Sequence, residues 1–203
     1  SLEKTNAKLI YARISGYGQT GPYAKKAGFA SVCEAFGGFR YVNGFPGEKP
    51  VRPNLSIGDT LAGIHAAMGV LLALIQREKD GKGQIVDVAI FEAIFNLLEA
   101  VIPEYSGSGL IRQPSGSTIT GIAPTNTYIC QDGKYIVIGA NTDSMFKRLA
   151  EAMGKPEIGL DQRMSDNAGR VAVQQELDDT IENWTKSLSA QEALSKLDEH
   201  SVA

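Results

Sequence analysis

The stretch GDTLAGIHAAMGVLLALIQREKDGKGQIVDVAI (Gly58–Ile90) decides the fold of this chain. In its first part, large apolar residues recur at steps of three, four and one, which is helical periodicity: Leu61, Ile64, Met68, Leu71, Leu72 and Ile75. Small residues occupy other positions of the same stretch: Ala62, Gly63, Ala66, Ala67, Gly69 and Ala73. A face of small residues lets a neighbouring backbone come close, so we predict a helix that is buried on both sides.

The segments on either side predict strands. The helix should end within REKDGKGQ (Arg77–Gln84), because cations in the last turn suit the helix dipole and a glycine can take the left-handed stop conformation. IVDVAI (Ile85–Ile90) then indicates a buried strand, and FEAIFNLLEAVI (Phe91–Ile102) an apolar helix. KLIYARI (Lys8–Ile14) indicates an earlier strand. Strand, helix, strand and helix in this order predict a right-handed parallel α/β layer.

Glycine residues indicate loops and helix breaks in the rest of the first hundred residues. The loop SGYGQTGPY (Ser15–Tyr23) follows the first strand, where ligands often bind in α/β sheets. It has neither the dinucleotide nor the Walker phosphate pattern, so turning the chain is slightly favoured over ligand contact. Phe29–Val42 predicts a helix broken at Gly37-Gly38, and the Pro-rich segment Asn43–Pro53 should be irregular.

The chain changes character after residue 102. Residues 1–102 form the α/β part, and residues 103–126, rich in Gly, Ser and Pro, indicate a linker or active-site loop. Residues 127–203 predict a small α+β domain, in which an Asp-Gly turn between two β runs indicates a hairpin over Thr127–Ala140. Three helices should follow, the last with a capping box at Ser189, near residues 142–153, 169–187 and 190–199.

Composition excludes several functional classes. A net charge of -3 without a basic run argues against nucleic-acid binding. Cys33 and Cys130 match no metal spacing, and two histidines do not make a His-rich metal site, so we expect free thiols, no metal and a cytoplasmic protein. We expect no apolar stretch of membrane-spanning length, no membrane partner and no signal peptide. Both ends look cut, so we expect a partial chain or a dimer.

Asp59 is the candidate catalytic residue. Aspartate is a favoured helix N-cap that contributes about 0.5–2 kcal/mol, and by spacing alone this capping role is the commoner one. An ionised carboxylate on a rigid helix is also a positioned nucleophile, and both roles are compatible. His65 lies on another face of the helix and is interpreted as a satisfied histidine. Three further acids in apolar helices can be buried and functional, although solvated roles are commoner: Glu34, Glu92 and Glu99.

Two segments together resemble the family III CoA-transferases. They are ARISGYGQTGPY (Ala12–Tyr23) and PVRPNLSIGDTLAGIHAAMGVLLALIQREKDGKGQIVDVAIFEAIF (Pro50–Phe95), and the likeness extends over nearly the whole chain. The resemblance implies a longer protein with a Rossmann-like parallel sheet in a large domain, a smaller α+β domain and an interlocked homodimer. It also implies an acyl-CoA and a small carboxylic acid as partners, coenzyme A thioester as a substrate and no permanently bound cofactor.

The resemblance further implies that Asp59 carries the reaction. Its carboxylate would attack the acyl-CoA thioester to give a mixed anhydride and CoA thiolate. The thiolate would then form an aspartyl-CoA thioester, from which an incoming acid takes the CoA by the reverse steps. The residues that bind CoA are not identified by the sequence, and the candidates are Phe29, Ala30, Gly116 and Gly121.

The chain departs from related enzymes at three places. The α-methylacyl-CoA racemases have a histidine base where this chain has Phe29, so a racemase-like enzyme is a disfavoured alternative. Ala30 stands where relatives often have an acid. The loop PSGSTITG (Pro114–Gly121) has fewer glycines than the active-site loop of formyl-CoA transferase, so its role as a lid is a hypothesis. A non-catalytic α/β binding or assembly module, in which Asp59 only caps its helix, is the second alternative.

Overall fold

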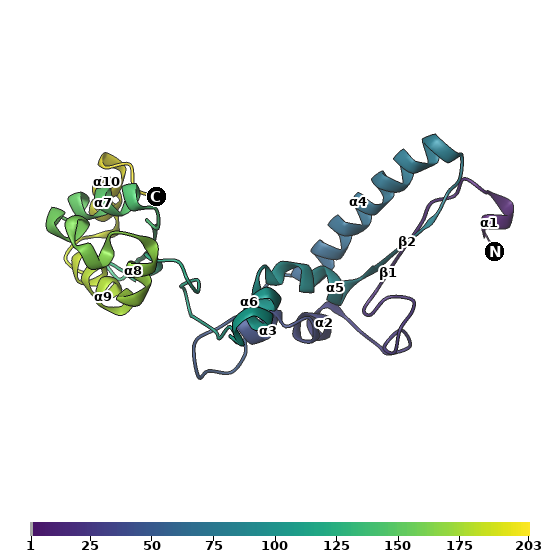
Figure 1. Ribbon diagram of the computed structural model, residues 1–203, viewed down its shortest axis with the longest axis horizontal. Helices are drawn as coiled ribbons and strands as arrows, with labels where there is room; N and C mark the ends of the chain where they lie inside the picture. The colour runs from purple at the N-terminus through teal and green to yellow at the C-terminus, as the bar shows by residue number, and fades with distance from the viewer. Residues whose placement is uncertain (1) are drawn as a thin grey trace. The chain divides into compact units, whose positions relative to one another are not determined.

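The computed structural model of the chain describes residues 2–203 and divides into two compact units (Figure 1). The first unit extends to Pro114, and the second runs from Ser115 to Ala203. The boundary falls inside the segment 103–126 predicted as a linker or loop. Part of that segment is regular structure, because α6 (Val101–Ser108) and β3 (Thr125–Ile129) extend into it.

The sheet of the first unit has two parallel strands, β1 (Tyr11–Ser15) and β2 (Ile85–Ala89). Their register places Tyr11 opposite Ile85 and Ser15 opposite Ala89. The long helix α4 (Ile57–Asp80) packs against both strands, as Figure 1 shows. The prediction of a parallel α/β arrangement is therefore confirmed.

The other helices of this unit are short: α1 (Leu2–Thr5), α2 (Ala30–Phe36), α3 (Phe39–Val42), α5 (Ile90–Phe95), the 3-10 turn η1 (Asn96–Leu98) and α6. The predicted break at Gly37-Gly38 is confirmed, since α2 ends before this pair and Gly38 has a φ of 91°. The single helix predicted over 91–102 is wrong. The chain leaves helical geometry at Glu99, which has a φ of 48°, so α5, η1 and α6 are separate.

The two faces of α4 differ in burial. Of its small residues, Ala62, Ala66 and Ala73 are buried, which confirms close packing for these three, whereas Gly63 and Ala67 are exposed. Most of its large residues are exposed, with 56% of Met68 and 65% of Leu72 accessible to solvent, whereas Leu61 is partly buried. Burial on both sides is therefore a wrong prediction for this chain, because the sheet covers only the small face. The buried strand is also partly wrong: of β2, only Val88 and Ala89 are buried.

Helix α4 bears on the expectation that no uninterrupted apolar stretch reaches membrane-spanning length. It has 24 residues and contains an 18-residue window with a mean hydropathy of 1.6, enough to cross a membrane by length and composition. Core helices of soluble proteins have the same composition. Length and composition alone therefore do not assign α4 to a membrane.

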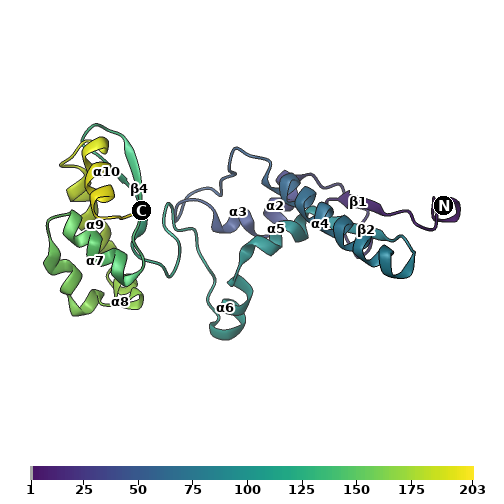
Figure 2. The ribbon, with the colours of Figure 1, turned by 90° about the horizontal axis from the view of Figure 1, so that it is seen from above.

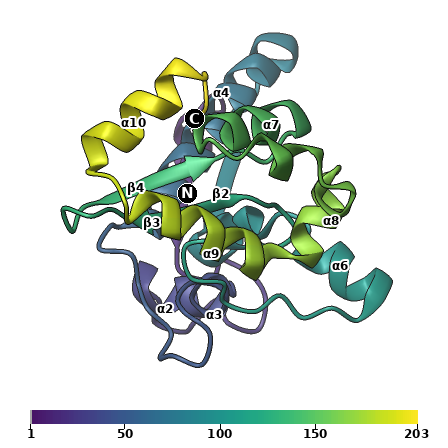
Figure 3. The ribbon, with the colours of Figure 1, turned by 90° about the vertical axis from the view of Figure 1, so that its left-hand side faces the viewer.

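The second unit is an α+β structure. Strands β3 and β4 (Tyr135–Gly139) pair antiparallel, which confirms the predicted hairpin. Helices α9 and α10 lie against it (Figure 3), and the capping box at Ser189 is present. The predicted helix over 169–187 is two helices instead, separated at Val173. The helical elements of this unit are α7 (Asp143–Ala152), η2 (Pro156–Leu160), η3 (Gln162–Met164), α8 (Asn167–Ala172), α9 (Gln174–Thr185) and α10 (Ala190–Glu199).

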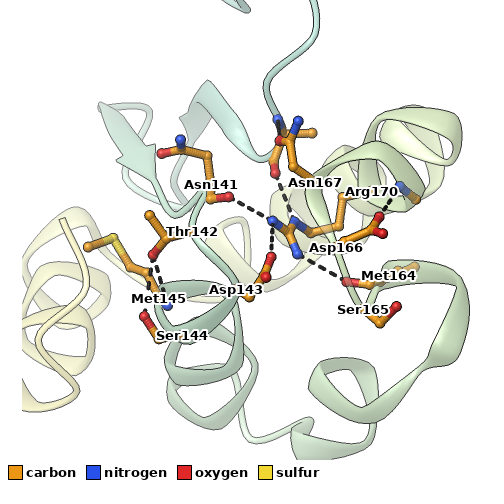
Figure 4. A network of polar contacts seen from close by, with 12 residues as sticks. Asn141, Thr142, Asp143, Ser144, Met145, Met164, Ser165, Asp166, Asn167 and Arg170 are labelled. Carbon is orange, nitrogen blue, oxygen red and sulfur yellow. Dashed lines mark hydrogen bonds and ion pairs between the residues drawn. The ribbon is translucent and has the colours of Figure 1, made fainter.

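A buried arginine, Arg170 of α8, connects separate segments of the second unit (Figure 4). Its guanidinium donates to the backbone carbonyls of Ala123 at 3.0 Å, Met164 at 3.1 Å and Asn141 at 2.7 Å. It also forms an ion pair of 2.9 Å with Asp143 at the start of α7. The guanidinium is therefore well satisfied although it is fully buried, which is the condition for placing a charge inside a protein.

Candidate active site

Three helices of the first unit begin at the carboxyl end of the parallel strands (Figure 2). Gly58, at the start of α4, lies against Ala30 at the start of α2 and Ile90 at the start of α5. A Cβ added to Gly58 would be 3.1 Å from side-chain atoms of both. In open α/β sheets ligands bind at this end of the strands. The packing of three helix starts therefore defines the candidate site.

The glycine-rich loop after β1 packs against the same candidate site. A Cβ added to Gly16 would lie 2.8 Å from both the Cα and the carbonyl oxygen of Gly28, so two backbones touch here. The carbonyl of Gly16 accepts hydrogen bonds from the Phe91 amide at 3.2 Å and from the Cys33 thiol at 3.3 Å. Glycine is thus required for close approach, which gives the loop a structural role in shaping the site.

We predict that Gly16→Ala disrupts this contact and lowers catalytic activity in the full-length protein by at least about tenfold, because a small misplacement of reacting groups has a large kinetic cost. The added methyl group would meet backbone rather than a movable side chain. Gly107→Ala in α6 is the control, since no atom lies within 4 Å of its added Cβ. The steady-state catalytic rates of the two full-length variants are compared, and equal rates for Gly16→Ala and Gly107→Ala would contradict the prediction.

Asp59 is the third residue of α4 and is exposed. The N-cap of this helix is Ser56, so Asp59 does not have the capping role considered for it. Within residues 2–203 we find no hydrogen bond or ion pair to its carboxylate. The first turn of a helix favours a negative charge through the helix dipole. Asp59 is therefore an accessible carboxylate on a rigid 24-residue helix.

The neighbouring thiol is a poor nucleophile. Burial raises the pKa of Cys33, and the negative charges of Asp59 and Glu34 raise it further. A thiol must lose its proton to become reactive. The Cys33 thiol thus stays protonated.

Comparison with known proteins assigns the family. A family profile described as CoA-transferase family III matches residues 1–203. This chain belongs to that family. It is 47% identical over 201 residues to a succinyl-CoA–D-citramalate CoA-transferase of Chloroflexus aurantiacus, covering 99% of this chain and 50% of that protein. It is 33% identical to an acetyl-CoA:oxalate CoA-transferase of Acetobacter aceti, covering 97% of this chain and 50% of the relative.

Solved structures agree with the family assignment. A CAIB/BAIF family protein from Brucella suis matches with a TM-score of 0.81 and 32% identity, over all of this chain and 53% of that one. Rv3272 from Mycobacterium tuberculosis matches with a TM-score of 0.85 and 26% identity, over all of this chain and 53% of that one. The chain spans about half the length of the curated relatives that it matches. The predicted α/β fold class is confirmed, and the coverage is consistent with the expected partial chain.

The structure distributes the predicted CoA-binding residues of this family member over both units. Phe29, the N-cap residue of α2, is 80% exposed, and Ala30 is buried against Gly58 beside the catalytic candidate. Gly116 and Gly121 belong to the second unit and have φ angles of 69° and 83°. Phe29 and Ala30 thus lie near Asp59, and contact of any of the four residues with CoA stays a prediction.

The remaining candidates have different surroundings. His65 Nδ1 lies 2.8 Å from the carbonyl oxygen of Leu61, which agrees with a satisfied histidine. Glu92 and Glu99 are exposed, whereas Glu34 is fully buried. The partners of Glu34 are Arg40 and Arg52. Sequence reasoning missed both arginines; the one available signal was the position of Arg52 in the Pro-rich segment just before α4.

Proposed function

We propose that the full-length protein transfers CoA from an acyl-CoA thioester to a free carboxylic acid, with Asp59 as the nucleophile. The observation that carries this proposal is the exposed Asp59 carboxylate at the carboxyl end of the parallel sheet. Membership of the CoA-transferase family III supports it. So do the names of relatives at 40–47% identity, which are CoA-transferases.

The proposed reaction proceeds through two kinds of covalent intermediate. An Asp59 oxygen attacks the thioester carbonyl, the carbon–sulfur bond breaks, and CoA leaves as a thiolate from a mixed anhydride. The thiolate attacks the Asp59 carbonyl and expels the acyl group as a carboxylate, which leaves an aspartyl-CoA thioester. An acceptor carboxylate then attacks this thioester, and the same two steps in reverse release a new acyl-CoA and free Asp59. Division into such steps replaces one difficult exchange by easier ones.

The chain itself supplies the position and the charge of the nucleophile. The α4 dipole favours the ionised carboxylate, and packing of Gly58 on Ala30 and Ile90 holds the start of the helix in place. A fixed nucleophile has less freedom to lose when it reacts. This chemistry requires neither a metal ion nor a permanently bound cofactor, because the nucleophile comes from Asp59 and the leaving group from the substrate.

The names of the relatives suggest the substrate class. Succinyl-CoA appears in the names of relatives that act with D-citramalate and L-malate, and another relative is named a succinate–glutarate CoA-transferase. We propose succinyl-CoA as the donor and a small dicarboxylic acid as the acceptor. The racemase-like alternative is disfavoured because Phe29 cannot carry a proton. The binding-module alternative lacks support from the enzymes that match this chain.

We also propose an interlocked homodimer of full-length chains in the cytoplasm. The exposed apolar face of α4, including Met68 and Leu72, is a surface suited to cover by further protein. Two relatives are named as the alpha and beta subunits of one CoA-transferase, which supports assembly of two chains. The cytoplasmic proposal rests on Cys33 and Cys130, which are free thiols in the described structure.

A trapping experiment tests the proposed function. The full-length protein is incubated with succinyl-CoA and hydroxylamine, which converts an aspartyl thioester into a hydroxamate, and its peptides are analysed by mass spectrometry. We expect the hydroxamate on the peptide that contains Asp59, with the exposed Asp80 at the far end of α4 as an internal unlabelled control. Binding of succinyl-CoA without any label, or label at another residue, would exclude Asp59 as the nucleophile.

A further inference from the structure

Glu34 and its two arginines form a charged cluster inside the first unit. The side chain of Glu34 has no exposed surface, and its Oε2 lies 3.0 Å from Arg52 Nε and 3.6 Å from an Arg40 terminal nitrogen. Arg40 also donates to the Ser31 hydroxyl at 2.9 Å. Yet neither Glu34 Oε2 nor Arg40 Nε makes a hydrogen bond within residues 2–203. The cluster thus retains one donor without an acceptor, Arg40 Nε, while Glu34 Oε2 is an acceptor in ion-pair contact with Arg52.

The charges of this cluster do not balance. Two guanidinium groups face one carboxylate, so the cluster carries one net positive charge. One arginine is enough to neutralise Glu34, and a second partly buried cation is costly unless a further anion is close. The side chains of Arg40 and Arg52 are 25% and 36% exposed, so an anion in solvent can reach them. Arginine is suited to this task because its planar fork binds a carboxylate through two hydrogen bonds.

The cluster lies close to the nucleophile. Glu34 follows Ala30 by four residues, about one turn, on the buried face of α2, which is about 6 Å along the helix axis. Ala30 contacts Gly58, which directly precedes Asp59. The charges of Asp59 and Glu34 both act on the Cys33 thiol and raise its pKa after burial does, so both carboxylates lie near that thiol.

We propose that Arg40 and Arg52 bind the distal carboxylate of a dicarboxylic acyl group while Asp59 reacts at its thioester end. This inference rests on the proposed function and specifies how the substrate class is recognised. The excess positive charge of the cluster is then balanced by the substrate. Donors that end in a methyl group lack this contact and react more slowly.

The test compares two donors of similar shape in the full-length protein. Succinyl-CoA carries a distal carboxylate, and butyryl-CoA has a methyl group in its place. The second-order rate constant of the first half-reaction, CoA transfer to the enzyme without acceptor, is measured by rapid quenching for both. We expect Arg40→Gln and Arg52→Gln each to lower the succinyl-CoA constant by about tenfold or more, the effect of losing a hydrogen bond to a charged group. The butyryl-CoA constant should stay within about threefold.

The ratio of the two constants separates recognition from folding, because both are measured on the same sample. Arg77→Gln, at the far end of α4, is the matched control and should leave the ratio unchanged. If a glutamine variant does not fold, the corresponding lysine variant, which keeps the charge and loses the fork, should still lower the ratio. Equal loss with both donors, or an unchanged ratio, would overturn the inference alone. A wild-type protein that reacts with neither donor would instead refute the proposed function.

Discussion

Asp59→Asn in the full-length protein is expected to lower kcat for CoA transfer by about a thousandfold or more, because an amide cannot act as the carboxylate nucleophile of a covalent route. The same change should alter the free energy of unfolding by less than about 1 kcal/mol, the usual range for one charge near a helix N-terminus. The small cost follows from the structure, where Asp59 is exposed and Ser56, not Asp59, is the N-cap.

Steady-state kinetics with succinyl-CoA and urea unfolding of the same preparations test both parts of this expectation. Asp59→Ala repeats the measurement without a side chain that can deamidate back to aspartate. Glu78→Gln, an exposed carboxylate near the other end of α4, is the matched control and should retain wild-type kcat. Normal transfer by Asp59→Ala would show that the chemistry belongs to another residue.

Arg170→Ala should have the largest effect on stability, with a loss of about 3 kcal/mol or more in the free energy of unfolding of the second unit. The substitution leaves the carbonyls of Ala123, Met164 and Asn141 without this donor in a place that solvent does not reach easily. It also removes the partner of Asp143 and a cation that lies 5.0 Å from the Phe146 ring.

Arg163→Ala is the control for this prediction, since Arg163 is also paired with carboxylates but has a side chain that is 56% exposed. Arg163→Ala should lower the free energy of unfolding by less than about 1 kcal/mol, as is usual for surface ion pairs. Urea unfolding and amide hydrogen exchange of peptides from residues 115–203 measure both changes. Similar costs for the two variants would mean that burial does not decide the contribution of Arg170.

Much of the backbone was predictable from local patterns. The periodicity around Leu61 to Ile75 specified α4, and the order of strands and helices specified a parallel sheet. The Asp-Gly turn specified the hairpin of β3 and β4. The helix and the hairpin depend on residues that are close together in the chain, so they are visible without the tertiary structure. The parallel pairing joins residues as far apart as Tyr11 and Ile85, and it was inferred from the order of the elements. Asp59 stood out as a single acid at the start of an apolar helix, but its role as a nucleophile was inferred from the resemblance to the CoA-transferases, since spacing alone favoured a cap.

Burial was less predictable, because it depends on what packs against each element. The composition of α4 indicated a helix covered on both sides, whereas Met68 and Leu72 are exposed in this chain. Likewise the apolar run after Phe91 indicated one helix, and the chain turns at Glu99 instead. A local pattern shows that a surface can be buried but does not supply the partner that buries it.

The sequence by itself thus determined the main helix, the parallel strands, the hairpin and Asp59 as the candidate nucleophile. Only the tertiary structure decided that Arg40 and Arg52 share the buried Glu34, and that Arg170 joins segments as far apart as Ala123 and Asp143. The physical reason is that backbone conformation follows mainly from nearby residues, whereas a charge is stabilised by whatever lies around it in space. Its partners can come from any part of the chain.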